Sequence, residues 1–193
     1  VWIEGNLVAD KGNYLVDTKH IGIQKVAGSV KVKDFSIDKL KMHLESDKAT
    51  VIGILPDSVV TKKKVIKINR GEDGDFKFDK NIDVAKVAVV ERHQMTGNVA
   101  TALIEGYGIK TGAIAVTVAH DSHNIIVVGT NNEDMAFAVS KLIELEGGIV
   151  VVDGGEVLES MPLPIAGLMS DKSGEWVRDK LTQIHNIAYD RLK

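Results

Sequence analysis

The densest group of side chains able to do chemistry lies in one short polar run. It reads His120-Asp121-Ser122-His123-Asn124 and stands between two apolar stretches. Two imidazoles three residues apart, with a carboxylate between them, could hold a metal ion, relay a proton or bind a polar heterocycle. The structural alternative is a turn in which Asp121 and Asn124 cap backbone groups. A hydrolytic triad within this run is disfavoured, because sequence neighbours rarely face one another and a triad is defined by geometry.

A second polar group follows a Val-rich stretch directly and consists of Glu91, Arg92 and His93. An acid, a guanidinium and an imidazole that leave a buried strand together suggest one side of a cleft. The structural alternative is an Arg–carboxylate pair that satisfies a partly buried edge.

Composition excludes several classes of function. The chain has 193 residues, no cysteine and a formal net charge of −3. Without cysteine there is no disulfide scaffold, thiolate metal site or Cys nucleophile, and no zinc site of the cytidine-deaminase type. The mildly acidic balance argues against nucleic-acid binding, and no apolar run approaches the ~18 residues of a membrane span. The first residues lack a signal-peptide pattern and an initiator Met, so we expect a cytoplasmic protein and a start inside a longer gene product.

Apolar runs and alternating patterns predict most of the strands. They fall at residues 49–55, 59–68, 84–90, 112–119 and 125–128. Residues 99–105 fit either a strand or a helix, and residues 69–75 are predicted to form a loop. Asp153-Gly154-Gly155, between two apolar stretches, predicts a hairpin, which Pro162 and Pro164 should end.

Two helices are predicted. The first should begin with a capping box of Thr130 and Glu133 and end at Gly147-Gly148, and the second should begin near Ser173. Their buried faces are predicted to be Met135, Ala138, Val139, Leu142 and Ile143 in the first helix and Val177, Leu181, Ile184 and Ala188 in the second. This mixture predicts an α+β fold, a layered mixed sheet with two main helices and β-hairpins, preceded by a small β fragment.

The chain is predicted to have three parts: a small β unit over residues 1–20, a linker with one or two strands over 21–48, and a main domain over 49–193. The lysine run at residues 62–64 is interpreted as a solvated strand edge, with a phosphate or nucleic-acid contact as the alternative. The apolar, proline-stiffened stretch 161–169 is predicted to pack in the core or against a partner.

Three stretches resemble the C-terminal domain of bacterial and archaeal adenine deaminases, members of the amidohydrolase superfamily. They are residues 89–98, 118–131 and 163–170, and the resemblance extends from about residue 49 to the end. Residues 1–9 resemble the last strands of the small β-sandwich that accompanies amidohydrolase barrels.

The resemblance implies hydrolysis of adenine to hypoxanthine and ammonia by a hydroxide on a divalent metal, manganese or iron. In that family a (β/α)₈ barrel holds the metal, beginning with a His-x-His pair. This chain has no His-x-His pair and is shorter than the ~250 residues of a typical barrel. We therefore expect no metal site in this chain, and an inactive chain when it is isolated. The implied partners are the barrel domain, adenine and further copies in a homo-oligomer, with no nucleic acid and no membrane.

Two hypotheses follow for the role of the domain. In the first, both polar groups form one cleft that closes over the barrel mouth, with His120, Asp121 and His123 supporting catalysis and Glu91, Arg92, His93 and Asn124 binding substrate. In the second, the domain is an assembly module: the 162–169 loop packs on the barrel or on a second subunit, and the histidines are structural.

Overall fold

A mixed eight-stranded sheet forms the centre of the fold. The computed structural model describes residues 1–17 and 21–193. The strand order is β14-β13-β11-β12-β9-β10-β5-β6, and β10 and β5 pair in parallel while the other neighbours are antiparallel. The strands are β5 (Lys48–Gly53), β6 (Lys62–Lys67), β9 (Val84–Val90), β10 (Val99–Glu105), β11 (Ala113–Val116), β12 (Ile125–Gly129), β13 (Gly148–Asp153) and β14 (Glu156–Pro162).

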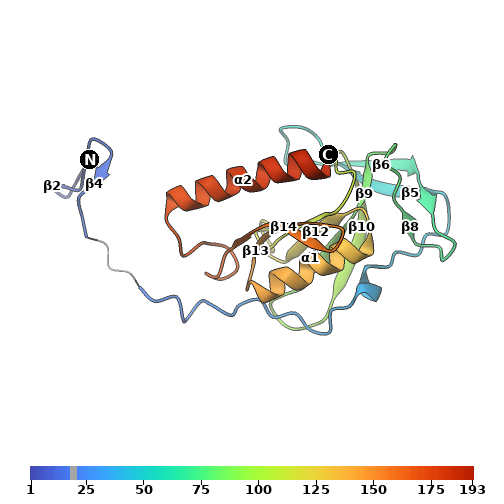
Figure 1. Cartoon of the computed structure of the whole chain (residues 1–193), viewed down its shortest axis with the longest axis horizontal. Coiled ribbons are helices and arrows are strands. Elements are labelled where there is room, and N and C mark those ends of the chain that lie inside the picture. Colours follow the sequence, from blue (N-terminus) through green and yellow to red (C-terminus); the bar gives the residue numbers. More distant parts are fainter. Residues whose placement is uncertain (18–20) are drawn as a thin grey trace.

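One helix packs on each face of this sheet (Figure 1). The helix α1 (Asn132–Glu144) covers β11, β12 and β13 on one side, and α2 (Gly174–Leu192) covers β13 and β14 on the other. Met135, Val139 and Leu142 of α1 are fully buried, as their spacing predicts, and Ile184 of α2 is 3% exposed. Burial of one such side chain contributes about 1.5–3 kcal/mol. The predicted layered α+β fold is confirmed.

The ends of α1 differ from the prediction. The capping box of Thr130 and Glu133 is wrong, because the Thr130 amide still donates to the Gly112 carbonyl at 3.0 Å, at the end of the sheet. The cap comes one residue later, where the Asn131 side chain accepts a hydrogen bond from the Asp134 amide at 2.7 Å. The left-handed residue after the helix is Glu146, with φ 58°, rather than one of the predicted glycines.

Several strand predictions need smaller corrections. Residues 99–105, which fitted either a strand or a helix, form a strand. The strand predicted over 59–68 is shorter, because only β6 (Lys62–Lys67) has strand structure. The predicted loop over 69–75 belongs to a short hairpin of β7 (Asn69–Arg70) and β8 (Phe76–Lys77). Hydrogen bonding to β13 ends at Pro162, as expected for a residue without an amide hydrogen. The lysine run lies on β6, an edge strand, as the sequence predicted.

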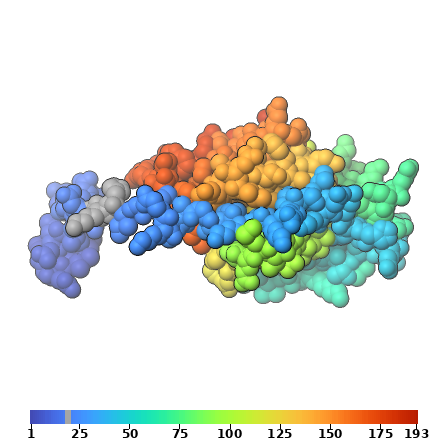
Figure 2. Space-filling model, turned by 90° about the horizontal axis from the view of Figure 1, so that it is seen from below, coloured from blue at the N-terminus to red at the C-terminus, as the bar shows by residue number. Residues whose placement is uncertain are grey.

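The segment before the main sheet is built differently from the prediction. In the described residues 21–47 there is no strand beyond one isolated bridge, and the only regular element is a short 3₁₀ helix, η1 (Ile37–Leu40). Its Leu40 is fully buried, and Val32 and Phe35 pack against the same core as α1. Figure 2 shows this segment laid across the α1 side of the molecule. The predicted strands are wrong, because the backbone of this segment bonds to loops instead of to a neighbouring strand, as in the hydrogen bonds from the Lys31 amide to the Arg92 carbonyl and from the Leu44 amide to the Gly74 carbonyl. Its apolar side chains still reach the core.

The small β fragment at the start consists of two hairpins. They pair β1 (Trp2–Ile3) with β2 (Asn6–Leu7) and β3 (Ala9–Asp10) with β4 (Asn13–Tyr14). Most of their apolar side chains are exposed, and Figure 1 shows them away from the main sheet. The predicted boundary at residue 20 falls on residues 18–20, outside the described part of the chain. Neither described helix has an apolar stretch of membrane-spanning length.

A buried lysine ties the sheet to α1 and to the segment before it. Lys86 on β9 is 3% exposed, and its ammonium donates to Asp75 at 2.8 Å, to Asn132 at 2.8 Å and to the Leu40 carbonyl at 3.0 Å. Burial acts to raise the pKa of Asp75, but hydrogen bonds from Lys86, Asn132 and the Met42 amide outweigh it, and the pKa is lowered. The three ammonium hydrogens thus have three acceptors.

We expect the Lys86→Met variant to lose about 3–5 kcal/mol of unfolding free energy at pH 7, because it leaves the Asp75 carboxylate buried without its cation. The double variant Lys86→Met/Asp75→Asn should recover part of that loss. The folded pKa of Asp75 lies below its unfolded value, so the stability from this pair is present above about pH 4 and is lost as the pH falls further. Urea unfolding at pH 7 and pH 3 measures both effects; an equal loss at both values would contradict the assignment.

Candidate functional site

The sheet brings the two polar groups of the sequence together. Val90, the last residue of β9, pairs with Ile125, the first residue of β12. Residues 91–93 therefore leave the sheet beside residues 122–124. The His93 Nε2 atom lies 3.0 Å from the Ser122 carbonyl.

Arg92 is the buried centre of this group and is only 1% exposed. Its Nε donates to the His123 carbonyl at 2.5 Å and its Nη2 to the Ala166 carbonyl at 3.1 Å, while its own carbonyl accepts from the Lys31 amide at 2.9 Å. Burial lowers the pKa of Arg92. Among the described residues no carboxylate pairs with it, so the Arg–carboxylate alternative is wrong. The guanidinium instead joins three segments that are distant in the sequence.

Glu91 is occupied by its own loop. Its carboxylate accepts from the backbone amides of His93, Gln94 and Thr96 and from the Thr96 hydroxyl, at distances of 2.5 to 3.0 Å. Hydrogen bonds from the Thr96, Gln94 and His93 amides lower the pKa of Glu91 to about 2. The geometry thus gives this side chain a structural task, and its role in substrate binding stays a prediction.

His120 and Asp121 form the exposed tip of the next loop. Their side chains are each 84% exposed and form an ion-pair contact with each other. The His120 and His123 rings meet edge to face, with centroids 5.8 Å apart. The tip can donate, accept or relay a proton to a ligand that another surface presents to it.

Three buried polar atoms of this group have no hydrogen-bond partner among the described residues. They are Arg92 Nη1, His123 Nδ1 and Asn124 Oδ1. Leaving one such group unpaired costs about 1–3 kcal/mol. Buried polar groups are nearly always satisfied, so the unpaired atoms of these three residues make the loop a candidate site, and its functional role stays a prediction.

The residues of the site do not suit a metal ion. Within residues 1–17 and 21–193, no three His, Asp or Glu side chains lie close enough together to ligate one. The Glu91 carboxylate is taken up by amides, and Asp121 is paired with His120. A closed site for a divalent metal needs at least three or four such donors converging on one point.

Two residues of the apolar stretch 161–169 belong to the core. Met161 and Leu163 are 3% and 4% exposed, whereas Met169 is 58% exposed. The turn within this stretch lies against Arg92: a Cβ built on Gly167 would stand 2.8 Å from Arg92 Nη1. The Thr117 hydroxyl donates to the Gly167 carbonyl at 2.5 Å and fixes the turn from its other side.

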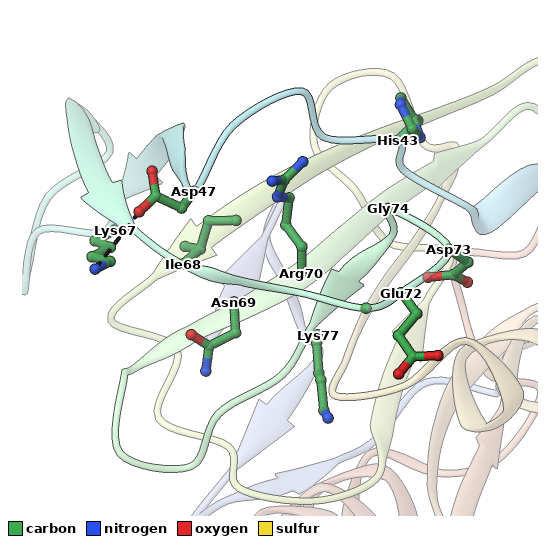
Figure 3. A pocket seen from close by; sticks show the side chains of 11 residues that line it. His43, Asp47, Lys67, Ile68, Asn69, Arg70, Glu72, Asp73, Gly74 and Lys77 are labelled. Carbon is green, nitrogen blue, oxygen red and sulfur yellow. Dashed lines mark ion pairs between the residues drawn. The ribbon is translucent and has the colours of Figure 1, made fainter.

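A charged groove, which the sequence did not predict, lies beside β6, β7 and β8. Its volume is about 670 Å³, and its lining includes His43, Arg70 and Lys77. Figure 3 shows Lys67 and Asp47 joined in an ion pair at its border. The basic cluster and the acidic 69–75 loop were visible in the sequence. The sequence did not show that residues 43–47 come to lie beside residues 67–77 to form the groove.

Comparison with known proteins assigns the chain to a family. The family described as the adenine deaminase C-terminal domain matches residues 58–192, and the chain belongs to it. "Adenine deaminase 2" of Desulfotalea psychrophila is 60% identical over 100% of the chain. "Adenine deaminase" of Ligilactobacillus salivarius and "Adenine deaminase 2" of Carboxydothermus hydrogenoformans are each 45% identical over 99% and 97%. The chain spans 33% of the length of each relative. The resemblance to the C-terminal domain of adenine deaminases is confirmed.

The contact between Gly167 and Arg92 gives a matched pair of variants. Gly167 and Gly155 have φ of 70° and 77°, but nothing lies within 4 Å of a Cβ on Gly155. Both alanine variants should lose about 1–2 kcal/mol from left-handed strain. We expect Gly167→Ala to lose about 1–3 kcal/mol more, because the guanidinium must shift from its two carbonyls.

Urea unfolding measures this difference, and histidine ring NMR signals report on the loop. Gly167→Ala should shift the signals of His120 and His123, whereas Gly155→Ala should leave them in place. Equal stability losses and unmoved signals in both variants would contradict the role of Arg92.

Proposed function

We propose that this chain is the C-terminal part of an adenine deaminase, which converts adenine and water into hypoxanthine and ammonia. The observation that carries the proposal is the family match over residues 58–192, together with relatives that are named adenine deaminases and align along the whole chain. Those relatives are about three times as long, so the remaining two thirds would supply the rest of the enzyme.

The reaction replaces the exocyclic amino group of the purine by oxygen, and it requires an activated water molecule. In the proposal a divalent metal, manganese or iron, supplies that activation. Because the donors in this chain do not suit a metal, the ligands of the metal would come from the barrel domain of the longer protein. This chain would then contact the bound purine or help to close the active site over it.

The loop over residues 120–124, with its exposed tip at His120 and Asp121, is the part of this chain best suited to that task. Arg92 holds the loop from within, and the side chains of His120 and Asp121 project outward. The orphaned atoms of His123 and Asn124 support a functional role over simple packing. We propose that this tip lies at the barrel mouth and contacts the purine or the attacking water.

An assembly module is the second candidate. The Glu91 carboxylate accepts from amides of its own loop and the Arg92 guanidinium donates to two backbone carbonyls, so two of the seven predicted site residues already serve the fold. Met169 leaves an exposed apolar side chain on the 162–169 loop. In this case the domain would stabilise the barrel or a homo-oligomer, and the histidines would not affect turnover.

An adenine deamination assay with added manganese, on this chain and on the full-length protein, tests the placement of the metal. We expect ammonia release from the full-length protein only. Deamination by residues 1–193 alone would contradict the placement of the metal ligands outside this chain.

A histidine pair separates the two candidate roles in the full-length protein. If His120 relays a proton, His120→Ala should lower kcat/KM by about 10²-fold or more, while the melting temperature stays within a degree or two. His185→Ala is the control, because His185 is exposed on α2, away from the tip. Unchanged kcat/KM with a lower melting temperature or an altered oligomer would support the assembly module instead.

A further inference from the structure

The two faces of the sheet are covered unequally. On the α1 side the cover continues past the helix, because Met42, Leu44 and Phe76 pack over the buried residues of β5, β9 and β10. On the other side α2 contacts β13 and β14. Figure 1 shows β5, β6 and β10 extending beyond the C-terminal end of α2.

Beyond α2 this second face carries mostly apolar side chains. Val87 and Ala102 are cross-strand partners, and Ile104 pairs with Ile52 on the next strand. On β6, Val65 lies opposite Thr50. We call this surface the open face and define it by Thr50, Ile52, Val65, Val87, Ala102 and Ile104.

Exposure rises steadily across the open face toward the sheet edge. Val87 and Ile104 are half-buried beside the core that α2 covers. Ile52 is 38% exposed and Val65 is 67% exposed. A contiguous apolar surface of this kind on a folded domain marks an interaction site.

Lysines border the open face. Side chains alternate along a strand, so Lys48 and Lys67 share this face with Ile52 and Val65, and Lys63 lies directly opposite Ile52. Lys48 and Lys67 also face each other across the strands, and like charges so placed repel. Within the described part of the chain, Lys67 pairs with Asp47 at 3.6 Å, while Lys48 and Lys63 have no ion pair. A partner that carries carboxylates would relieve this repulsion.

We propose that the open face is the docking surface of this domain for the remaining two thirds of the longer protein, with carboxylates of that part meeting Lys48 and Lys63. This inference rests on the proposed function, which makes the chain one part of such a protein. The relatives are about three times as long as the chain, so a large body of protein must lie against some surface of it. The open face has the apolar centre and charged rim of such an interface.

Because this chain has no cysteine, a thiol introduced into it is its single labelling site, and mass spectrometry of peptides from residues 1–193 measures its labelling in the full-length protein. In the full-length protein we expect the V65C thiol to react about tenfold or more slowly than the V157C thiol. Val157 lies on β14, at the other end of the sheet, and is 40% exposed against 67% for Val65. An uncovered face would therefore give the reverse order. Labelling in urea supplies the reference rate for each thiol.

The rim is tested by adding K48E and K63E to the V65C variant, which should speed its labelling if carboxylates meet these lysines. Faster labelling of V65C than of V157C in the folded protein would overturn the proposal. Protection that disappears when light scattering shows dissociation into monomers would also overturn it, in favour of a second copy as the occupant. Deaminase activity of the same samples is measured separately, so a protected face without adenine turnover would count against the proposed function and leave the docking surface standing.

Discussion

The arrangement of the site depends on one buried guanidinium. Arg92 has no carboxylate partner among the described residues, and carbonyl oxygens of His123 and Ala166 meet its charge instead. A carbonyl accepts preferentially along its lone-pair directions, so each bond restricts the backbone that provides it. The loop that bears the two histidines and the turn around Gly167 are thereby held against the end of β9, and an exposed loop gains a fixed position that its own short sequence could not supply.

A second buried cation has a different role on the α1 side. Lys86 is fully satisfied by a carboxylate, an amide and a carbonyl, whereas Arg92 keeps one nitrogen without a partner. The difference matches their positions, since Lys86 closes the interior between sheet, helix and the preceding segment, and Arg92 lies under the surface where the site is proposed. A buried cation whose hydrogen bonds are all made stabilises the fold, which is the role of Lys86.

Periodicity and turn chemistry were enough to predict most of the sheet and both helices. The Val-rich run 84–90 and the glycine turn at 153–155 needed no information beyond their neighbours. The helix cap was misplaced because the Thr130 amide is used by a distant glycine carbonyl, a contact that local sequence does not reveal. The strands predicted for segment 21–47 were wrong for the same reason, since its apolar side chains pack into a core formed by α1 and the sheet, which are distant in the sequence.

The two polar groups of the candidate site could be recognised in the sequence, but neither their proximity nor the contacts of each side chain could be. The pairing of β9 with β12 follows from no local pattern, yet it alone places His93 beside Ser122. Glu91 looked like a free acid, and only the backbone of its own turn shows that its oxygens are already engaged.

Leu40 carries a consequence for where this domain can be cut. Its side chain is completely enclosed by the layer that α1 forms on the sheet, and the carbonyl of the same residue accepts a hydrogen bond from the Lys86 ammonium. A shortened version starting at the first long strand would expose that interior to water and remove an acceptor from a buried ammonium. A shortened version that keeps this interior intact would therefore have to include the stretch around Leu40, whose side chain packs into the same core as α1.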